Sequence, residues 1–330
     1  MSLTPRITVA MSVYNDEPYV GESIESILRQ TFTDFEFLII DDRSTDGSAA
    51  VIAQKAAQDS RITVLASPEK GRVPALNALF GAARAPWVAI MDSDDISMPD
   101  RLARQMAMAD SDARLGVIGC SAFLIDAAGK RIGDGTAKPA THADVLKCLE
   151  DKPLINHNAV LIRRDPVLAL GGYHRAYRHA EDYDLWLRLV DSVRFANLPE
   201  DLVAYRIYAD QVSTKHVVEQ TANAAISWQA YCERRAGRAD PTAALTHLPP
   251  LSELDALFGR NGVAAYARRR IVNRILFSPE ALANDGYRPV IDHIGEAGPN
   301  KQLWRACARL LRAGYPGKAS GLARALLVSG

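Results

Sequence analysis

The chain has 330 residues, more than one hydrophobic core usually organises, so we expect a large α/β domain with a further region attached. Its 39 basic residues match its 39 acidic ones, which excludes general attraction to nucleic acid and requires any phosphate binding to be local. The four cysteines lie far apart, which argues against a zinc knuckle or a disulfide framework. Neither a signal sequence nor a membrane-spanning run is recognised, so we expect a cytoplasmic protein.

The first half of the chain alternates short apolar runs with amphipathic stretches. The apolar runs predict strands at Ile7–Val13, Phe35–Ile40, Ile62–Leu65 and Trp87–Met91. The amphipathic stretches predict helices at Glu22–Gln30, Gly47–Gln58, Val73–Ala83 and Pro99–Met108. This order predicts right-handed βαβ units and a mainly parallel sheet.

After about residue 115 the alternation stops. Leu115–Leu124 is another apolar run, residues 126–130 predict a hairpin turn, and Asn156–Ile162 predicts a strand. Ala180–Val190 carries apolar residues at helical spacing. Past Lys215, alanine, leucine and arginine dominate, so we expect a catalytic domain over residues 1–215 and a mostly helical region over residues 216–330.

Polar residues follow the predicted strands at their carboxyl ends, where parallel sheets bind ligands. Asp92-Ser93-Asp94-Asp95 follows one strand, and three carboxylates so close together repel one another unless a cation neutralises them. Such oxygen ligands suit Mg²⁺ or Mn²⁺ bound with phosphates, although a helix cap with a solvated turn explains the same pattern. Asp42 is placed to accept a hydrogen bond from a base N–H, and Asp46 to cap the next helix.

Taken together, these motifs resemble those of the family 2 glycosyltransferases, which have the GT-A fold. The resemblance runs from Ile7 to about Ser213 and rests on the joint order of the blocks Val9–Asn15, Ser26–Thr31, Ile40–Gly47, Met91–Asp95, Gly171–Tyr173 and Ala180–Arg188. It implies an α/β, GT-A-type sheet flanked by helices. It also implies an inverting, metal-dependent transfer of one sugar from a nucleotide-diphosphate donor, with UDP the favoured nucleotide, in bacterial polysaccharide or glycoconjugate synthesis.

By this resemblance, Ser12, Tyr14 and Asp42 bind the nucleoside, with Asp42 facing the base. Asp92 approaches the ribose, and Asp94, the second acid of the DXD motif, holds Mn²⁺ or Mg²⁺. Arg72, with Lys70, is a candidate for the diphosphate, although solvated loop charges explain both residues more simply. Asn77 matches another family position, and a buried asparagine that ties loops together is the alternative for it.

The resemblance also implies that Asp182 is the catalytic base that takes the proton of the acceptor hydroxyl. Without it, Glu181 and Asp182 would be explained by the preference of carboxylates for a helix N-terminus. Two departures from the family pattern stand out. Arg43 replaces a common glycine, and Tyr208 replaces a histidine that follows Tyr-Arg-Ile, which leaves His157 as the remaining candidate imidazole.

The expected partners are a nucleotide-sugar donor and a glycan, lipid-linked or protein acceptor. A non-catalytic nucleotide-sugar-binding scaffold is the main alternative, because a fold alone does not prove catalysis. A sugar nucleotidyltransferase is disfavoured because Ser12–Glu17 lacks a glycine-rich, basic phosphate loop.

The C-terminal region contains an apolar stripe flanked by arginines, at Leu303, Trp304, Cys307, Leu310 and Leu311. A helix packed on its own domain explains the stripe most simply. An amphipathic helix on an anionic membrane, which would make the protein peripheral to the cytoplasmic membrane, is the alternative.

Overall fold

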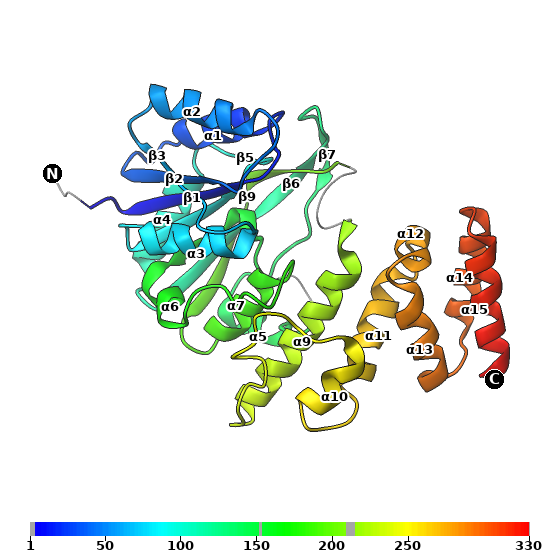
Figure 1. Ribbon diagram of the computed structural model, residues 1–330. Helices are drawn as coiled ribbons and strands as arrows, with labels where there is room; N and C mark the ends of the chain where they lie inside the picture. The colour runs from blue at the N-terminus through cyan, green and yellow to red at the C-terminus, as the bar shows by residue number, and fades with distance from the viewer. Residues whose placement is uncertain (1–3, 152–153, 209–214, 330) are drawn as a thin grey trace. The chain divides into compact units, whose positions relative to one another are not determined.

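The computed structural model describes residues 4–151, 154–208 and 215–329, drawn as ribbons in Figure 1. They divide into two compact units, Met1–His174 with Leu185–Tyr208, and Arg175–Asp184 with Ala209–Gly330. Ser213, where the family resemblance ends, lies outside the described residues, and the boundary expected at residue 215 stays a prediction. In the described part of the chain, no helix is both long and apolar enough to cross a bilayer.

The described part of the first unit is built on one sheet with the strand order β3-β2-β1-β4-β8-β6-β9-β5, and β7 pairs with β6. The strands are β1 (Ile7–Val13), β2 (Phe35–Asp41), β3 (Ile62–Leu65), β4 (Trp87–Asp92), β5 (Ile96–Ser97), β6 (Leu115–Ile125), β7 (Arg131–Asp134), β8 (Leu161–Arg163) and β9 (Arg194–Arg206). Strand β1 pairs in parallel with β2 and β4, and β2 pairs in parallel with β3. The predicted mainly parallel sheet is therefore confirmed, with antiparallel pairing between the described strands confined to β5, β7 and β8 against their neighbours.

Helices cover both faces of this sheet, as apolar strands buried on both sides require. They are α1 (Val20–Leu28), α2 (Ser48–Gln58), α3 (Arg72–Ala82), α4 (Arg101–Ser111), α5 (His142–Lys147), the 3-10 turn η1 (His157–Ala159), α6 (Arg164–Ala169) and α7 (Glu181–Leu189), whose first residues belong to the second unit. Alternate strand residues such as Val9 and Met11 pack against apolar residues of α1, α2 and α4. Helix α3 lies across the opposite face, below the sheet in Figure 1.

One predicted strand is wrong over most of its length. Within the predicted strand Asn156–Ile162, residues His157–Ala159 form the 3-10 turn η1. Only the short strand β8 (Leu161–Arg163) follows it. The side chain of Asn158 explains the difference, because it turns into the interior and bonds to Asp95 instead of continuing an alternating pattern. By contrast, the hairpin predicted at residues 126–130 is confirmed by the antiparallel pairing of β6 with β7.

The second unit is helical wherever the structure describes regular structure in it. Its remaining elements are α9 (Val217–Arg235), the 3-10 turn η2 (Leu251–Glu253), α10 (Leu254–Leu257), α11 (Val263–Ile275), α12 (Pro279–Ala283), α13 (Tyr287–Ala297), α14 (Lys301–Arg312) and α15 (Pro316–Val328). Apolar residues of α11 to α15 form a core of their own. The expected helical C-terminal region is thereby confirmed.

Candidate active site at the ends of strands β1, β2 and β4

The carboxyl ends of three adjacent parallel strands bring the predicted donor-binding residues to one edge of the sheet. In the strand register, Ser12 of β1 lies beside Asp92 of β4, and Val13 of β1 lies beside Asp41 of β2. The chain leaves the sheet after these positions, so Tyr14, Asp42 and Asp94 start three neighbouring loops. Polar side chains of these loops gather at this edge, some exposed like Tyr14 and others buried like Asp42 and Asp95.

Asp92, Asp94 and Asp95 form a tight acidic cluster. Each offers a carboxylate oxygen, and these oxygens all lie within 4.8 Å of one another. Burial, with the nearby Asp92 and Asp16 carboxylates, raises the pKa of Asp94 to about 6. Burial likewise raises the pKa of Asp95 well above its usual range. The neighbouring carboxylates add to the effect of burial, so ionised forms of these acids repel one another unless a cation lies between them.

Asp92 has a cationic partner within the cluster. The Arg72 guanidinium donates to Asp92 Oδ1 at 2.7 Å and lies 3.0 Å from His157 Nδ1. Although burial acts against it, the positive charge of Arg72, with that of His157, lowers the pKa of Asp92. His157 Nε2 lies 2.8 Å from the Tyr173 hydroxyl. Arg72 therefore lies at the edge of the acidic cluster while 40% of its side chain stays exposed, and its contact with a diphosphate stays a prediction.

Asp95 is fully buried and belongs to the scaffold of the loop. Its Oδ1 accepts a hydrogen bond from the backbone N–H of Arg206 at 2.8 Å, and its Oδ2 accepts one from the Asn158 amide. The backbone carbonyl of Asp95 accepts a bond from the Ser23 hydroxyl at 2.6 Å. These bonds fix the direction in which the neighbouring Asp94 points.

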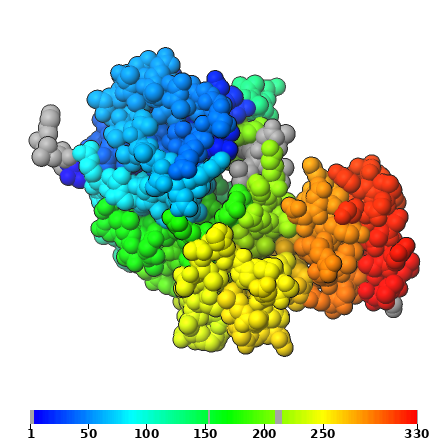
Figure 2. Space-filling view, in the orientation of Figure 1, coloured from blue at the N-terminus to red at the C-terminus, as the bar shows by residue number. Residues whose placement is uncertain are grey.

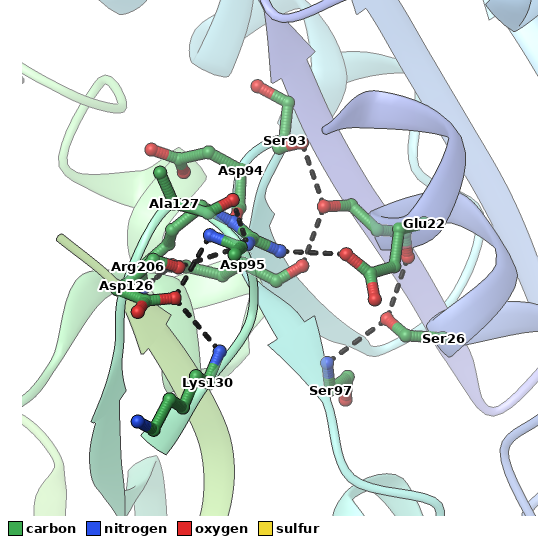
Figure 3. A network of polar contacts seen from close by, with 12 residues as sticks. Glu22, Ser26, Ser93, Asp94, Asp95, Ser97, Asp126, Ala127, Lys130 and Arg206 are labelled. Carbon is green, nitrogen blue, oxygen red and sulfur yellow. Dashed lines mark hydrogen bonds and ion pairs between the residues drawn. The ribbon is translucent and has the colours of Figure 1, made fainter. Parts of the chain in front are cut away.

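Arg206 is the buried centre of a polar network that supports the acidic loop (Figure 3). Its guanidinium donates to the Asp94 carbonyl at 2.7 Å, to Glu22 Oε2 at 2.7 Å and to the Ala127 carbonyl at 3.1 Å. Sequence reasoning did not identify Arg206 or Asn158 as contributors to the site. The only available signal for Arg206 was its place in the family-like Tyr205-Arg206-Ile207 run.

Asp94 is the carboxylate best suited to a cation. The Tyr208 hydroxyl donates to Asp94 Oδ2 at 2.9 Å, whereas Oδ1 makes no hydrogen bond to another of the described residues. Burial raises the pKa of Tyr208, so its phenol stays neutral and offers the carboxylate a proton rather than a positive charge. Among the described residues, Asp94 has no cationic partner. The three clustered carboxylate oxygens fit Mg²⁺ or Mn²⁺.

Asp16, which was not predicted from the sequence, lies close to the acidic cluster. It follows β1, and its carboxylate accepts a hydrogen bond from the Ser93 hydroxyl. Burial, together with the neighbouring Asp92, raises the pKa of Asp16. No local pattern distinguished Asp16 from any other loop carboxylate, because the contact joins residues far apart in the chain.

Asp42 is buried and ties down the loop before α3. Its two oxygens lie 2.9 and 2.8 Å from the backbone nitrogen of Gly71, and the Ser67 hydroxyl donates to Oδ1 at 3.2 Å. An ionised carboxylate has acceptor sites beyond these bonds. Contact of Asp42 with a base therefore stays a prediction, next to a structural role that the geometry establishes.

Other predicted residues divide between the site and the scaffold. Tyr14 is 46% exposed, and Lys70 Nζ lies 4.8 Å above its ring. Asn77 bonds through both ends of its amide to the backbone of Tyr173, which confirms the alternative that it ties loops together. Asp46 Oδ1 accepts a hydrogen bond from the backbone N–H of Ser48 at 3.0 Å. The N-cap residue of α2 is Gly47, without a side-chain cap, so Asp46 lies one residue before the capping position.

Asp182 lies in the first turn of α7, in the part of that helix assigned to the second unit. Its Oδ1 accepts a hydrogen bond from the Tyr183 backbone N–H at 2.7 Å. The neighbouring acids Glu181 and Asp184 are buried, whereas Asp182 is partly exposed. Of these three carboxylates, Asp182 is the one that an acceptor can reach from solvent.

A second group with ligand-type atoms, His179, His216 and Glu219, occurs in the second unit. The two imidazole rings are stacked, with centroids 4.3 Å apart and planes inclined by 11°. A metal ion lies close to the plane of each imidazole that binds it, and two nearly parallel stacked planes share no point within bonding distance. This arrangement does not fit chelation by both histidines.

Comparison with known proteins decides the family. The model of glycosyl transferase family 2 matches residues 8–167. The O-antigen biosynthesis glycosyltransferase WbnJ of Escherichia coli is 35% identical over 211 residues, 61% of this chain and 80% of WbnJ. The chain belongs to glycosyl transferase family 2. This protein is therefore a glycosyltransferase, and the sheet edge described above lies within the part that its relatives share.

Solved structures show the same fold as this glycosyltransferase. Residues 1–349 of TarS from S. aureus, in complex with UDP, align with a TM-score of 0.57 at 16% identity, covering 98% of this chain and 88% of that chain. The mannosyltransferase PcManGT from Pyrobaculum calidifontis, in complex with GDP-Man and Mn²⁺, aligns with a TM-score of 0.55 at 18% identity, covering 99% and 86%. The GT-A fold is thereby confirmed.

Proposed function

We propose that this glycosyltransferase transfers a single sugar from a UDP-sugar to an acceptor hydroxyl with inversion, in the cytoplasm, during synthesis of a bacterial polysaccharide or glycoconjugate. The observation that carries the proposal is Asp94, a carboxylate without a cationic partner among the described residues, beside an acidic cluster where three parallel strands end. WbnJ, a relative named for O-antigen biosynthesis, supports the choice of product class. The acceptor is a glycan, a lipid-linked glycan or a protein.

In this proposal, the donor lies across the edge formed by β1, β2 and β4. Ser12 and Tyr14 contact the nucleoside, Asp42 faces the base, and Asp92 faces the ribose. Arg72 meets the diphosphate, a role supported by the hydrogen bond to Asp92 that holds its guanidinium at this edge. Asp94 holds Mn²⁺ or Mg²⁺, which, when bound, supplies positive charge that stabilises the leaving diphosphate. The bound nucleotides in the TarS and PcManGT structures support a nucleotide-sugar donor.

Asp182 acts as the general base of the displacement. It takes the proton from the acceptor hydroxyl while the oxygen forms a bond to the anomeric carbon and the bond to the diphosphate breaks. A metal-assisted leaving group needs no protonation, so one base is sufficient. Direct displacement of this kind reverses the configuration of the anomeric carbon.

The test is an assay of product release with a panel of UDP-, GDP- and dTDP-sugars, with and without Mn²⁺. A glycosyltransferase of the proposed kind releases UDP in a metal-dependent reaction. In a parallel assay with a nucleoside triphosphate and a sugar 1-phosphate, release of pyrophosphate would identify nucleotidyl transfer. Binding of the nucleotide sugars without release of any product would identify a scaffold. A product that keeps the α-linkage of an α-linked donor would contradict the inverting mechanism.

A further inference from the structure

Helix α14 (Lys301–Arg312) presents two different sides. Its inner side is the buried set Leu303, Ala306, Cys307 and Leu310, which packs in the core formed by α11 to α15. The packing explanation of the predicted apolar stripe is confirmed for these residues. Two members of that stripe lie outside the core, because Trp304 is 42% exposed and Leu311 is 56% exposed.

The exposed side of α14 is itself amphipathic. Trp304, Ala308 and Leu311 are all exposed and follow one another at spacings of four and three residues, which places them in one row along the helix. Lys301, Arg305 and Arg312 are also exposed, and the same helical geometry places them in the adjacent row. An apolar row and a basic row therefore run side by side on the surface.

The positive charge around this surface is not neutralised locally. Residues 297–330 contain six basic residues and no acidic residue. Within the described parts of the chain, Lys301, Arg305, Arg312 and Arg324 form no ion pair with a carboxylate. Arg309 lies instead over the ring of Phe277, with its guanidinium 4.5 Å from the ring centre.

Helix α15 adds further apolar surface near the end of the chain. Leu327 is 72% exposed and Val328 is 81% exposed, and Arg324 lies one turn before them. Atoms of α14 and α15, drawn in red, are at the surface in the space-filling view (Figure 2). We call the exposed residues Lys301, Trp304, Arg305, Leu311 and Arg312 of α14 the C-terminal basic face.

We propose that the C-terminal basic face binds the surface of a membrane that contains anionic phospholipids. Trp304 and Leu311 enter the boundary between head groups and acyl chains, while Lys301, Arg305 and Arg312 remain at the phosphates. Charge complementarity favours this occupant over a second copy of the chain, since two such faces in contact would oppose their positive rows. The proposal concerns a binding surface and is independent of the identity of the donor or acceptor sugar.

The experiment is flotation of the full chain with vesicles of phosphatidylcholine alone or of phosphatidylcholine mixed with phosphatidylglycerol. We expect flotation only with the anionic vesicles, and less of it at high salt, because exposed charges are screened. Replacement of both Arg305→Glu and Arg312→Glu should lower the partition coefficient about 20-fold or more, as expected for loss of two basic residues near an anionic surface. Trp304→Ser with Leu311→Ser should lower binding at both salt concentrations.

A matched control separates a local surface from a general effect of net charge. Arg29 and Arg114 lie in the first unit and are 75% and 68% exposed, so Arg29→Glu with Arg114→Glu changes the net charge equally at a different place. This control should float like the parent protein. Circular dichroism and melting temperatures should be unchanged in the Trp304/Leu311 and Arg305/Arg312 variants, because all four side chains are exposed.

Several results would overturn the proposal. These are the absence of flotation with anionic vesicles at low salt, equal flotation with neutral vesicles, and an equal loss of binding in the Arg29/Arg114 control. Self-association that disappears in the Trp304/Leu311 variant, without flotation of the parent, would assign the surface to a second copy. Binding to polyglutamate without flotation would assign it to an acidic protein.

Discussion

Charged side chains are arranged in opposite ways at the sheet edge of the first unit and on the C-terminal basic face of the second. At the sheet edge, Arg206 is 1% exposed, and its guanidinium meets backbone carbonyls and the Glu22 carboxylate. On the basic face, Arg305 and Arg312 are exposed and form no ion pair with another described residue. Buried charges need fixed partners and so define a geometry, whereas exposed charges stay available to an external ligand.

The largest expected effect tests the proposed base. Asp182→Asn keeps the shape and most hydrogen bonds of the carboxylate but removes its basicity, so transfer should fall about 10²–10⁴-fold while donor binding is retained. Steady-state rates and calorimetry measure the two quantities separately. Asp165→Asn, a change in the first turn of α6 at a side chain that is 87% exposed, should leave the rate unchanged. Near-normal turnover of the Asp182 variant would exclude it as the base.

A second prediction tests whether the buried network holds the acidic loop. Arg206→Met removes several hydrogen bonds and leaves buried carbonyls without donors, so the free energy of unfolding should fall by about 3–5 kcal/mol. Chemical denaturation measures this loss. Arg104, 56% exposed and paired with Glu200, provides the contrast, because Arg104→Met should cost less than about 1 kcal/mol. Equal losses in the two variants would show that burial of Arg206 has no special importance.

A third prediction concerns Tyr208, which stands where the family pattern has a histidine. A neutral imidazole is a metal ligand, whereas the phenol of Tyr208 only donates to Asp94. Tyr208→His should therefore tighten Mn²⁺-dependent UDP binding about tenfold, equivalent to about 1.4 kcal/mol. Titration calorimetry with and without Mn²⁺ measures the change. Unchanged affinity would mean that this position does not face the cation.

The smallest expected effect concerns the backbone at Arg43. This residue has φ 63°, in the left-handed region that disfavours side chains, which agrees with the glycine that the family resemblance implies at this position. Arg43→Gly should raise the free energy of unfolding by about 1 kcal/mol. Arg43→Ala keeps the Cβ atom and should give no such gain. If both variants were equally stable, the left-handed conformation would carry no cost.

The sequence predicted the strands and the donor edge because their signals are local. Asp92 and Asp94 directly follow an apolar run, and the carboxyl ends of parallel strands meet at one edge of the sheet. The residues that support the edge were missed for the opposite reason. Arg206 reaches the Asp94 carbonyl across 112 positions of the chain, and Asn158 reaches Asp95 across 63. No window of sequence contains both partners of such contacts.

The C-terminal prediction was right for the buried residues of α14 and wrong for two others. Helical spacing identified the apolar stripe of α14 but did not separate its buried residues from Trp304 and Leu311, since neighbouring positions on a helix differ only modestly in direction. Packing of α11 to α15 decides which row is covered. A side chain's exposure therefore became known only from the tertiary structure.

The measurement that tests the account most directly is calorimetric titration of UDP into the parent protein and into Asp94→Asn, each with and without Mn²⁺. The parent should bind UDP far more tightly with the cation than without it. Asp94→Asn should lose this metal-dependent gain, at least about 100-fold in affinity, and should keep its melting temperature, because loss of one charge relieves repulsion from Asp92. Mn²⁺-dependent binding of equal strength in both proteins would contradict the assignment of Asp94 and, with it, the proposed donor site.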